Sequence, residues 1–415
     1  MQGAPNKGLL RATLTLLAGG ALAQALPLLL GPWLTRLYTP AEFGHFSLVW
    51  TIATNLAVVG CARYEFALPL EREPAGAALL MGLCARVLAG VVLVSIAIAA
   101  VLVAAQDLAL GWWLPLAVLV GALTQWLTLW ATRAERFSAL ALARVLQWGG
   151  AAVLQLLFGL FSTIGALGLM LGPLIASLLT AFLLARPAPA GGWRALLQQP
   201  AAQLRAMARK HKDFPLLNTP HAFASALQDS LALLLIAHMA GDAAAGYWAL
   251  ALRYLKAPAG LIGGALSQTL YPRLVAAAAP AEALALVRRA MAALMALALP
   301  LAILLTLWGP ELFTLAFGER WLDAGALARA LAVYVGLHFI ASPLSVAMMA
   351  WGAQAWGLRL ALVGQAMFVG GLLLGLHFGG LIGAGWGVSA AMLLYFGYFF
   401  WSLATWSDFK NASLD

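Results

Sequence analysis

The run GAALLMGLCARVLAGVVLVSIAIAAVLVA, residues 76–104, decides the fold class of this protein. It contains one charged residue, Arg86, and its apolar residues follow one another without the alternation of a half-buried strand. About 20 mostly apolar residues cross the hydrocarbon core of a bilayer as a helix. Because backbone groups find no water there, such a run predicts a transmembrane helix.

The rest of the chain has the same character. Of its 415 residues, 63% are hydrophobic and 9% are charged, whereas a soluble domain carries roughly 25% charged residues. The net charge of +9 does not require nucleic acid as a partner, because Lys and Arg also hold membrane loops on the cytoplasmic side. The composition therefore predicts an all-α polytopic membrane protein and argues against a nucleic-acid binder.

Twelve apolar segments predict twelve transmembrane helices. Short connections with turn residues and charges, such as TPAEFG and FGERWLDAG, separate them. The first segment resembles a signal peptide at its start, but apolar sequence continues to Leu34, which favours an uncleaved helix over a cleaved leader. The predicted segments are 12–34, 44–62, 76–104, 112–132, 138–160, 163–185, 214–239, 246–276, 284–308, 325–351, 355–377 and 381–406.

The loop charges give this topology an orientation. With the N-terminus inside, alternate loops hold nearly all of the Lys and Arg residues, which predicts that both termini are cytoplasmic. The predicted outside loops carry only Arg36, Arg320 and Arg329. The inside loops carry Lys7, Arg11, Arg63, Arg72, Arg133, Arg136, Arg186, Arg194, Arg205, Arg209, Lys210, Lys212, Arg273, Arg288, Arg289, Arg359 and Lys410.

A basic stretch at the midpoint predicts two six-helix halves around a central cavity: residues 1–187, a cytoplasmic linker over 188–213, and residues 214–415. Leu196, Leu197, Leu204 and Met207 recur at helical spacing among Lys and Arg, so we expect an amphipathic helix on the anionic inner surface.

The two halves also look related. LTRLYTPAEFGHFSLVW (34–50) aligns with LIAHMAGDAAAGYWALAL (235–252), and Gly44 then matches Gly246. In this alignment Thr51 and Thr54 correspond to Arg253 and Lys256. Six helices plus six in a parallel repeat is a known transporter plan.

Several stretches together resemble the bacterial polysaccharide and oligosaccharide flippases, often labelled lipopolysaccharide biosynthesis proteins, of the multidrug/oligosaccharidyl-lipid/polysaccharide exporter superfamily. These stretches are LTRLYTPAEFGHFSL (34–48), RYEFALPL (63–70), LAFGERWLDAGALARALAVYVGLHFIASPLSVAMMAWGAQ (315–354) and GLIGAGWGVSAAML (380–393). The resemblance implies a bacterial inner-membrane protein that turns an undecaprenyl-diphosphate-linked oligosaccharide to the outer leaflet by alternating access. It also implies that polysaccharide polymerase or chain-length machinery acts as a partner. Family members often carry several Arg or acids in first-half helices, where this chain has few.

The predicted binding residues are ionisable or polar groups inside spans, which are functional candidates by default. Arg253 and Lys256 lie three apart in the eighth span and suit an anionic diphosphate. Asp229, in the seventh span, falls at a similar depth, so an ion pair with Arg253 or Lys256 that only joins two helices is the alternative to a cationic cavity wall.

Further candidates lie in other spans. Arg86 and Arg144 either snorkel to the cytoplasmic surface or receive the diphosphate in the inward-open state. Gln24, Asn55 and Gln268 either bond neighbouring helices or line the cavity and meet sugar hydroxyls.

Other functions fit less well. No Walker-type phosphate loop is present, the predicted outer loops are short for a glycosyltransferase or polymerase, and a drug or cation exporter of the same superfamily would favour buried acids. The six His residues show no metal-ligand spacing, and Cys61 and Cys84 form no CxxC motif. The sequence therefore predicts a transporter without catalytic residues, metal or cofactor.

Overall fold

The computed structural model describes residues 7–407 apart from 190 and 278, and the regular elements in this part are all helices, without a strand. The side chains at 7–18, 106, 217, 221, 224, 225, 265 and 354 are not described. Lys7, Arg11 and Lys410, which entered the charge argument, therefore lie outside the described side chains.

The chain divides into two compact units, Met1–Leu234 and Leu235–Asp415. The basic linker belongs to the first unit, and the division falls within α10, whereas the sequence predicted a boundary at residue 213. The described helices of the first unit are α1 (Lys7–Leu37), α2 (Pro40–Val58), α3 (Pro74–Gln106), α4 (Leu114–Arg133), α5 (Phe137–Arg144), α6 (Ala151–Phe161), α7 (Ala166–Leu184), α8 (Gly192–Ala195), α9 (Ala201–Lys210) and α10 (Thr219–Ala240), the last of which continues into the second unit.

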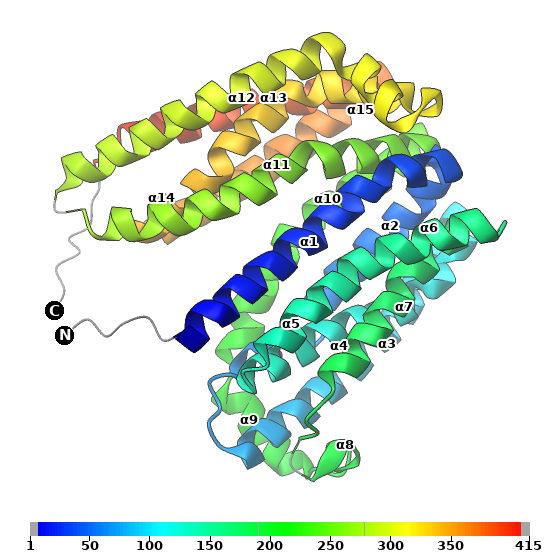
Figure 1. Ribbon diagram of the computed structural model, residues 1–415, viewed down its shortest axis with the longest axis vertical. Helices are drawn as coiled ribbons and strands as arrows, with labels where there is room; N and C mark the ends of the chain where they lie inside the picture. The colour runs from blue at the N-terminus through cyan, green and yellow to red at the C-terminus, as the bar shows by residue number, and fades with distance from the viewer. Residues whose placement is uncertain (1–6, 190, 278, 408–415) are drawn as a thin grey trace. The chain divides into compact units, whose positions relative to one another are not determined.

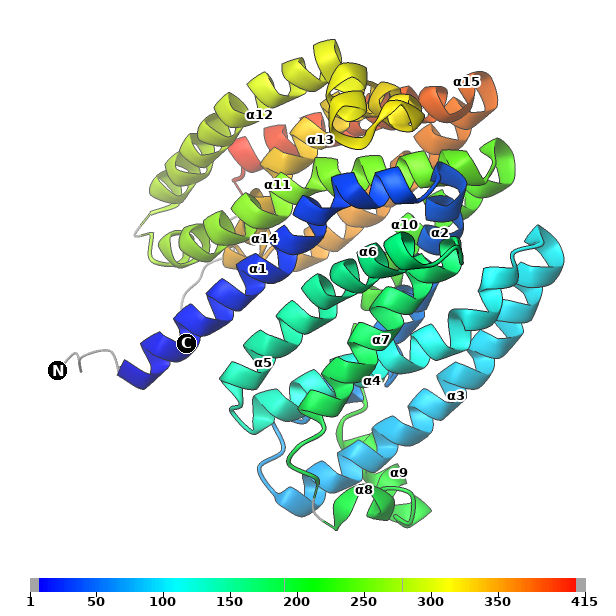
Figure 2. The same ribbon diagram turned by 45° about the vertical axis from the view of Figure 1, so that its right-hand side comes forward.

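The second unit consists of longer helices, two of which are interrupted. Trp308 departs from helical geometry inside α12, and Gly379 and Gly380 break α15 into two arms. α12 and α13 lie side by side in both views (Figures 1 and 2). The bounds are α11 (Asp242–Val275), α12 (Pro280–Phe317), α13 (Leu322–Leu344), α14 (Val346–Ala350) and α15 (Gln354–Ala404).

Each predicted span falls on one or more helical segments of the structure. The predicted span at 138–160 comprises α5, a π-helical turn at Val145–Gly150, and α6. The two predicted spans at 355–377 and 381–406 are the two arms of α15. Within the described residues, seven helices are long and apolar enough to cross a membrane, judged by length and composition. The expected all-α class is confirmed.

The arms of α15 approach closely because glycines line their contact. A Cβ built on Gly371 would lie 2.5 Å from the carbonyl oxygen of Gly387, and one on Gly375 would lie 2.2 Å from that of Gly383. No side chain fits at such distances, so these glycines hold the two arms together as a tight helical hairpin.

Candidate functional site

Arg253 and Lys256 lie near the middle of α11, on one face, and both are half-buried. α11 begins at Asp242, four residues earlier than the predicted span. With 1.5 Å of rise per residue, Arg253 and Lys256 are about 17 and 21 Å from the start of the helix. The structure thus places two cations near the middle of a long helix.

Aromatic side chains surround this part of α11 within the second unit. The Nζ atom of Lys256 lies 6.0 Å from the ring centroid of Tyr334 on α13, at the outer limit of a cation–π contact. Tyr334 in turn contacts His338 and Phe368, with ring centroids 5.9 and 5.7 Å apart. Sequence reasoning missed Tyr334, because helical spacing within one segment does not reveal a partner on another helix.

Asn55 is buried in the first unit and acts as a tether between α2 and α10. Its Nδ2 atom donates to the carbonyl of Ala226, at 2.7 Å, and to the hydroxyl of Ser230, both on α10. This is the helix–helix bonding that the sequence left open for Asn55. Asp229, the next residue to Ser230, is exposed and makes interactions of its own. Its expected pairing with Arg253 or Lys256 would join residues of different units and stays a prediction.

The side chain of Arg86 is hydrogen-bonded to backbone carbonyls of the same chain. Its Nη1 atom donates to the carbonyls of Gly82 and Leu196, and its Nη2 atom to those of Leu197 and Gln199, each at 3.1 Å. Four of the five guanidinium donors are therefore used. In this conformation Arg86 fixes the linker to α3, which leaves little capacity for a phosphate.

The remaining predicted residues are exposed on separate helices. Arg144 ends α5, and a Cβ built on Gly20 of α1 would lie 3.7 Å from its Nη1 atom. Gln24 is exposed on α1 and Gln268 on the second half of α11. Of the predicted binding residues, Asn55 is thus hydrogen-bonded to the helix that carries Asp229.

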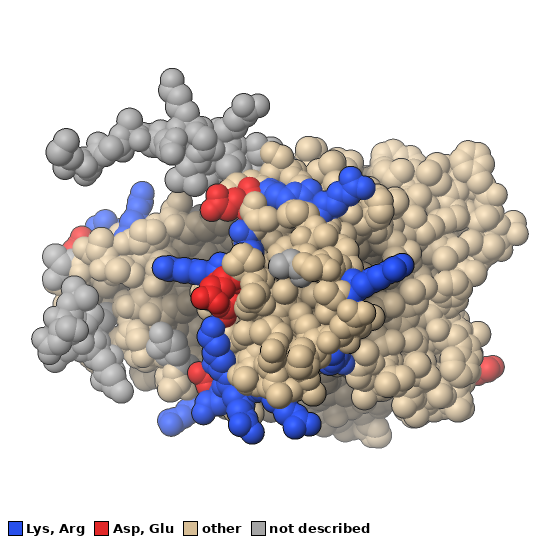
Figure 3. Space-filling view, turned by 90° about the horizontal axis from the view of Figure 1, so that it is seen from below, with Lys and Arg blue, Asp and Glu red and all other residues tan. Residues whose placement is uncertain are grey.

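The linker forms two short helices, of which α9 packs on α3, and the segment between them hydrogen-bonds to α3. Leu196, Leu204 and Met207 are buried, and α9 packs on α3, while Leu197 is 72% exposed. The apolar face expected to enter lipid is therefore covered by protein. Figure 3 shows Lys and Arg gathered on the face that carries α8 and α9, where Arg194, Arg205, Arg209, Lys210 and Lys212 are exposed.

An ion pair reinforces this docking. Lys210 bonds to the carboxylate of Glu71 at 2.5 Å, and the Nε2 atom of His211 lies 3.5 Å from the same oxygen. The hydrogen bond from Lys210 lowers the pKa of Glu71 below its ordinary value, and His211 adds to this effect. Since the folded pKa is depressed, Glu71 stabilises the fold above its unfolded pKa, and this contribution is lost as the pH falls through the folded pKa.

A buried acid between α2 and α3 also escaped the sequence analysis. Glu65 is 1% exposed, and its Oε1 atom accepts a 2.9 Å hydrogen bond from Gln125 on α4. Its Oε2 atom has no hydrogen-bond partner among the described residues, and burial raises the pKa of Glu65. Cys61 and Cys84, which are both free and buried, belong to one hydrophobic cluster in this region of the first unit.

A model of the family described as "Polysaccharide biosynthesis protein" matches residues 33–326 of the chain. This match covers most of the sequence. The chain belongs to the polysaccharide biosynthesis protein family. No curated protein matches the sequence.

Solved structures with the same fold are membrane transporters. The lipid II flippase MurJ, in an inward closed conformation, is 12% identical with a TM-score of 0.68, over 95% of this chain and 88% of that one. An inward-facing multidrug resistance MATE family transporter of the MOP superfamily is 17% identical with a TM-score of 0.62, over 92% and 96% of the two chains. A MOP superfamily transporter from Pyrococcus furiosus, whose binding pocket is described as having reverse polarity, is 17% identical with a TM-score of 0.54, over 97% of each chain.

These findings confirm the expected fold and the recognised family. The protein has an all-α polytopic membrane fold, and the solved structures that share this fold are a lipid II flippase and MATE family transporters. At these identities the structures establish the fold alone.

Proposed function

We propose that this member of the polysaccharide biosynthesis protein family translocates an oligosaccharide linked to undecaprenyl diphosphate by alternating access. The observation that carries the proposal is the position of Arg253 and Lys256 near the middle of α11. The family description and the fold shared with a lipid II flippase support it.

The chemistry of the two cations suits a diphosphate. A planar guanidinium can donate two parallel hydrogen bonds to phosphate oxygens, and an ammonium supplies a compact positive charge. Ionisable side chains within a predicted span are functional candidates by default, and cations there suit an anionic partner. An anionic headgroup that must cross the same low-dielectric layer is such a partner.

The experiment uses proteoliposomes that contain the full chain and a fluorescent lipid-diphosphate oligosaccharide. The double variant Arg253→Gln/Lys256→Gln should lower the translocation rate by a factor of about 100 or more, because each charge-assisted bond contributes roughly 1.5–3 kcal/mol. Arg289→Gln is the matched control, since Arg289 is exposed near the start of α12. Translocation at the wild-type rate by the folded double variant would overturn the site assignment.

The alternative function is drug or cation export, which is consistent with the fold shared with MATE transporters. The same vesicles distinguish the two. Uptake of a cationic dye by the wild type, without translocation of the lipid-linked oligosaccharide, would favour the exporter.

We further propose an inner-membrane location with both termini in the cytoplasm, supplying polymerase or chain-length machinery on the other side. The distribution of Lys and Arg supports this orientation. A cysteine introduced at exposed Ser407, in a Cys61→Ala/Cys84→Ala background, should react with an impermeant maleimide in inverted vesicles only. Equal labelling in right-side-out cells would contradict it.

A further inference from the structure

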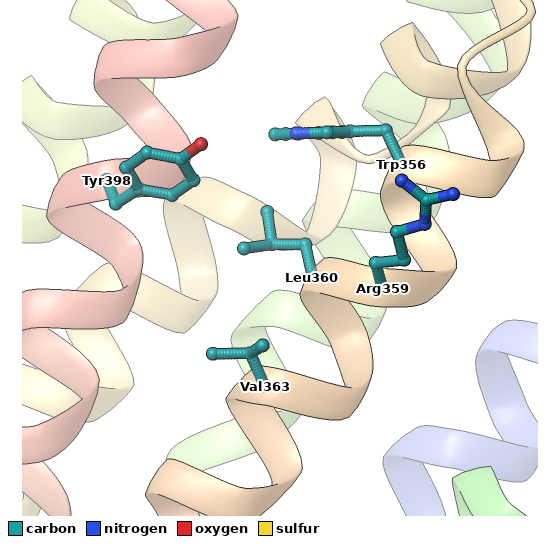
Figure 4. Close-up of a pocket in the computed structure, with 5 residues that line it drawn as sticks. All are labelled: Trp356, Arg359, Leu360, Val363 and Tyr398. Atoms are coloured by element: carbon teal, nitrogen blue, oxygen red, sulfur yellow. The ribbon is translucent and has the colours of Figure 1, made fainter.

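A groove of about 360 Å³ lies between the two arms of α15 in the second unit. Its size falls within the roughly 300–1,000 Å³ of small-molecule pockets. Figure 4 shows four of its lining side chains on the first arm and one on the second. They are Trp356, Arg359, Leu360, Val363 and Tyr398.

The lining changes from polar to apolar along the first arm. The guanidinium of Arg359 lies beside Trp356 in the first turns of α15, and the hydroxyl of Tyr398 is at the same end (Figure 4). Leu360 and Val363 follow further along the arm. A ligand that fills the groove therefore needs a polar group at one end and a hydrocarbon portion at the other.

The aromatic wall is fixed by packing. Trp356 stacks on Phe399, with centroids 6.4 Å apart and an interplanar angle of 13°, and meets Trp406 at 5.0 Å and 69°. The Nε1 atom of Trp406 is buried and has no hydrogen-bond partner among the described residues. Trp and Tyr concentrate where membrane meets water, so this end of α15 is suited to the headgroup layer.

The surface around the groove is apolar. Leu358, Leu362, Leu394 and Trp401, all on α15, are between 49% and 70% exposed, and Val363 itself is 51% exposed. An apolar surface of this kind on a membrane protein faces acyl chains. A ligand therefore reaches the groove from the bilayer rather than from water.

The charge of the groove selects the headgroup. Arg359 is exposed and makes no hydrogen bond or ion pair with any described residue, and no acid lines the groove. A guanidinium with open donors on an aromatic wall binds phosphate oxygens well.

We propose that this groove binds an anionic phospholipid, with its phosphate on Arg359 and an acyl chain along Leu360 and Val363. The lipid is a bound component of the protein, and the proposal does not depend on which substrate is transported.

The test is native mass spectrometry of the full-length protein in detergent, titrated with phosphatidylglycerol or with phosphatidylcholine of the same acyl chains. The wild type should retain phosphatidylglycerol at least fivefold more than phosphatidylcholine. Arg359→Gln should lose this preference, Arg359→Lys should keep part of it, and the control Arg289→Gln should keep all of it. Equal retention of both lipids by the wild type, or an unchanged preference in Arg359→Gln, would overturn the proposal.

Further measurements identify which molecule occupies the groove. Val363→Trp should reduce phosphatidylglycerol binding several-fold, because the indole fills the apolar end of the groove. Inorganic phosphate at millimolar concentration should not displace the lipid, and displacement would show a simple anion site instead. Displacement by an isoprenyl diphosphate at a lower concentration than phosphatidylglycerol requires would assign the groove to the carrier lipid and also overturn the phospholipid proposal.

Discussion

α2 in the first unit and α11 in the second begin alike and then differ in charge. The sequence alignment relates residues 202 positions apart, since Gly44 matches Gly246, and the two helices start at Pro40 and Asp242, which are also 202 apart. Residues 43–49 and 245–251 show the same order of buried and half-buried side chains, as do 51–54 and 253–256. This agreement supports the predicted repeat at the level of single residues.

The difference between the helices lies in what each polar position contacts. In α2, the hydroxyl of Thr54 donates to the carbonyl of Thr51, and Asn55 bonds to α10. The positions that match Thr51 and Thr54 in α11 carry Arg253 and Lys256, and Lys256 lies over the ring of Tyr334. One architecture therefore serves as a neutral tether in the first unit and as a cationic element in the second.

The largest effect on stability is expected at Asn55, which joins α2 to α10. Asn55→Ala removes both hydrogen bonds to α10 and leaves a buried hydroxyl and carbonyl with fewer partners, so the free energy of unfolding should fall by about 1.5 kcal/mol. Thermal unfolding in detergent, followed by tryptophan fluorescence, measures this change. Ser47→Ala, on the same helix, should have little effect. A variant as stable as the wild type would mean that Asn55 does not hold α2 to α10.

A smaller effect is expected at the start of α2, which has a capping box that α11 lacks. Thr39 accepts a bond from the backbone of Glu42, and the carboxylate of Glu42 accepts one from the backbone of Thr39. Gly241 provides no side-chain cap for α11. Thr39→Ala should cost about 1 kcal/mol in the same unfolding assay, while Thr39→Ser should retain most of the wild-type stability. If Ser is as costly as Ala, the methyl group rather than the cap is responsible.

The smallest effect is expected between Lys256 and Tyr334. Because Tyr334 is buried, its removal alone would also leave a cavity, so a double-mutant cycle with Lys256→Met and Tyr334→Leu is needed to isolate the pair. At 6.0 Å the coupling energy should be about 0.5 kcal/mol, and Tyr334→Phe should preserve it. A coupling energy of zero would mean that Lys256 and Tyr334 do not interact.

The fold followed from the sequence to a large extent, whereas the site followed only in part. Twelve apolar runs predicted the helices because hydrocarbon allows no other spanning structure for such runs. The role of Arg86 was left open, since the four carbonyls that it binds lie within its own turn and in the linker, about 110 residues away. The linker itself has the amphipathic pattern of a lipid-surface helix, but its apolar face packs on α3. Hydrophobic spacing shows that a face is buried without showing what covers it.

The sequence by itself determined the all-helical membrane fold, and it predicted the internal alignment of α2 with α11 and two cations within a span. These features depend on composition and on spacing along one helix, which are local. The tertiary structure decided which groups meet: Asn55 with Ser230, Lys256 with Tyr334, Glu65 with Gln125, and the arms of α15 around Trp356 and Arg359. Those contacts join helices distant in the chain, and only three-dimensional packing brings such side chains together.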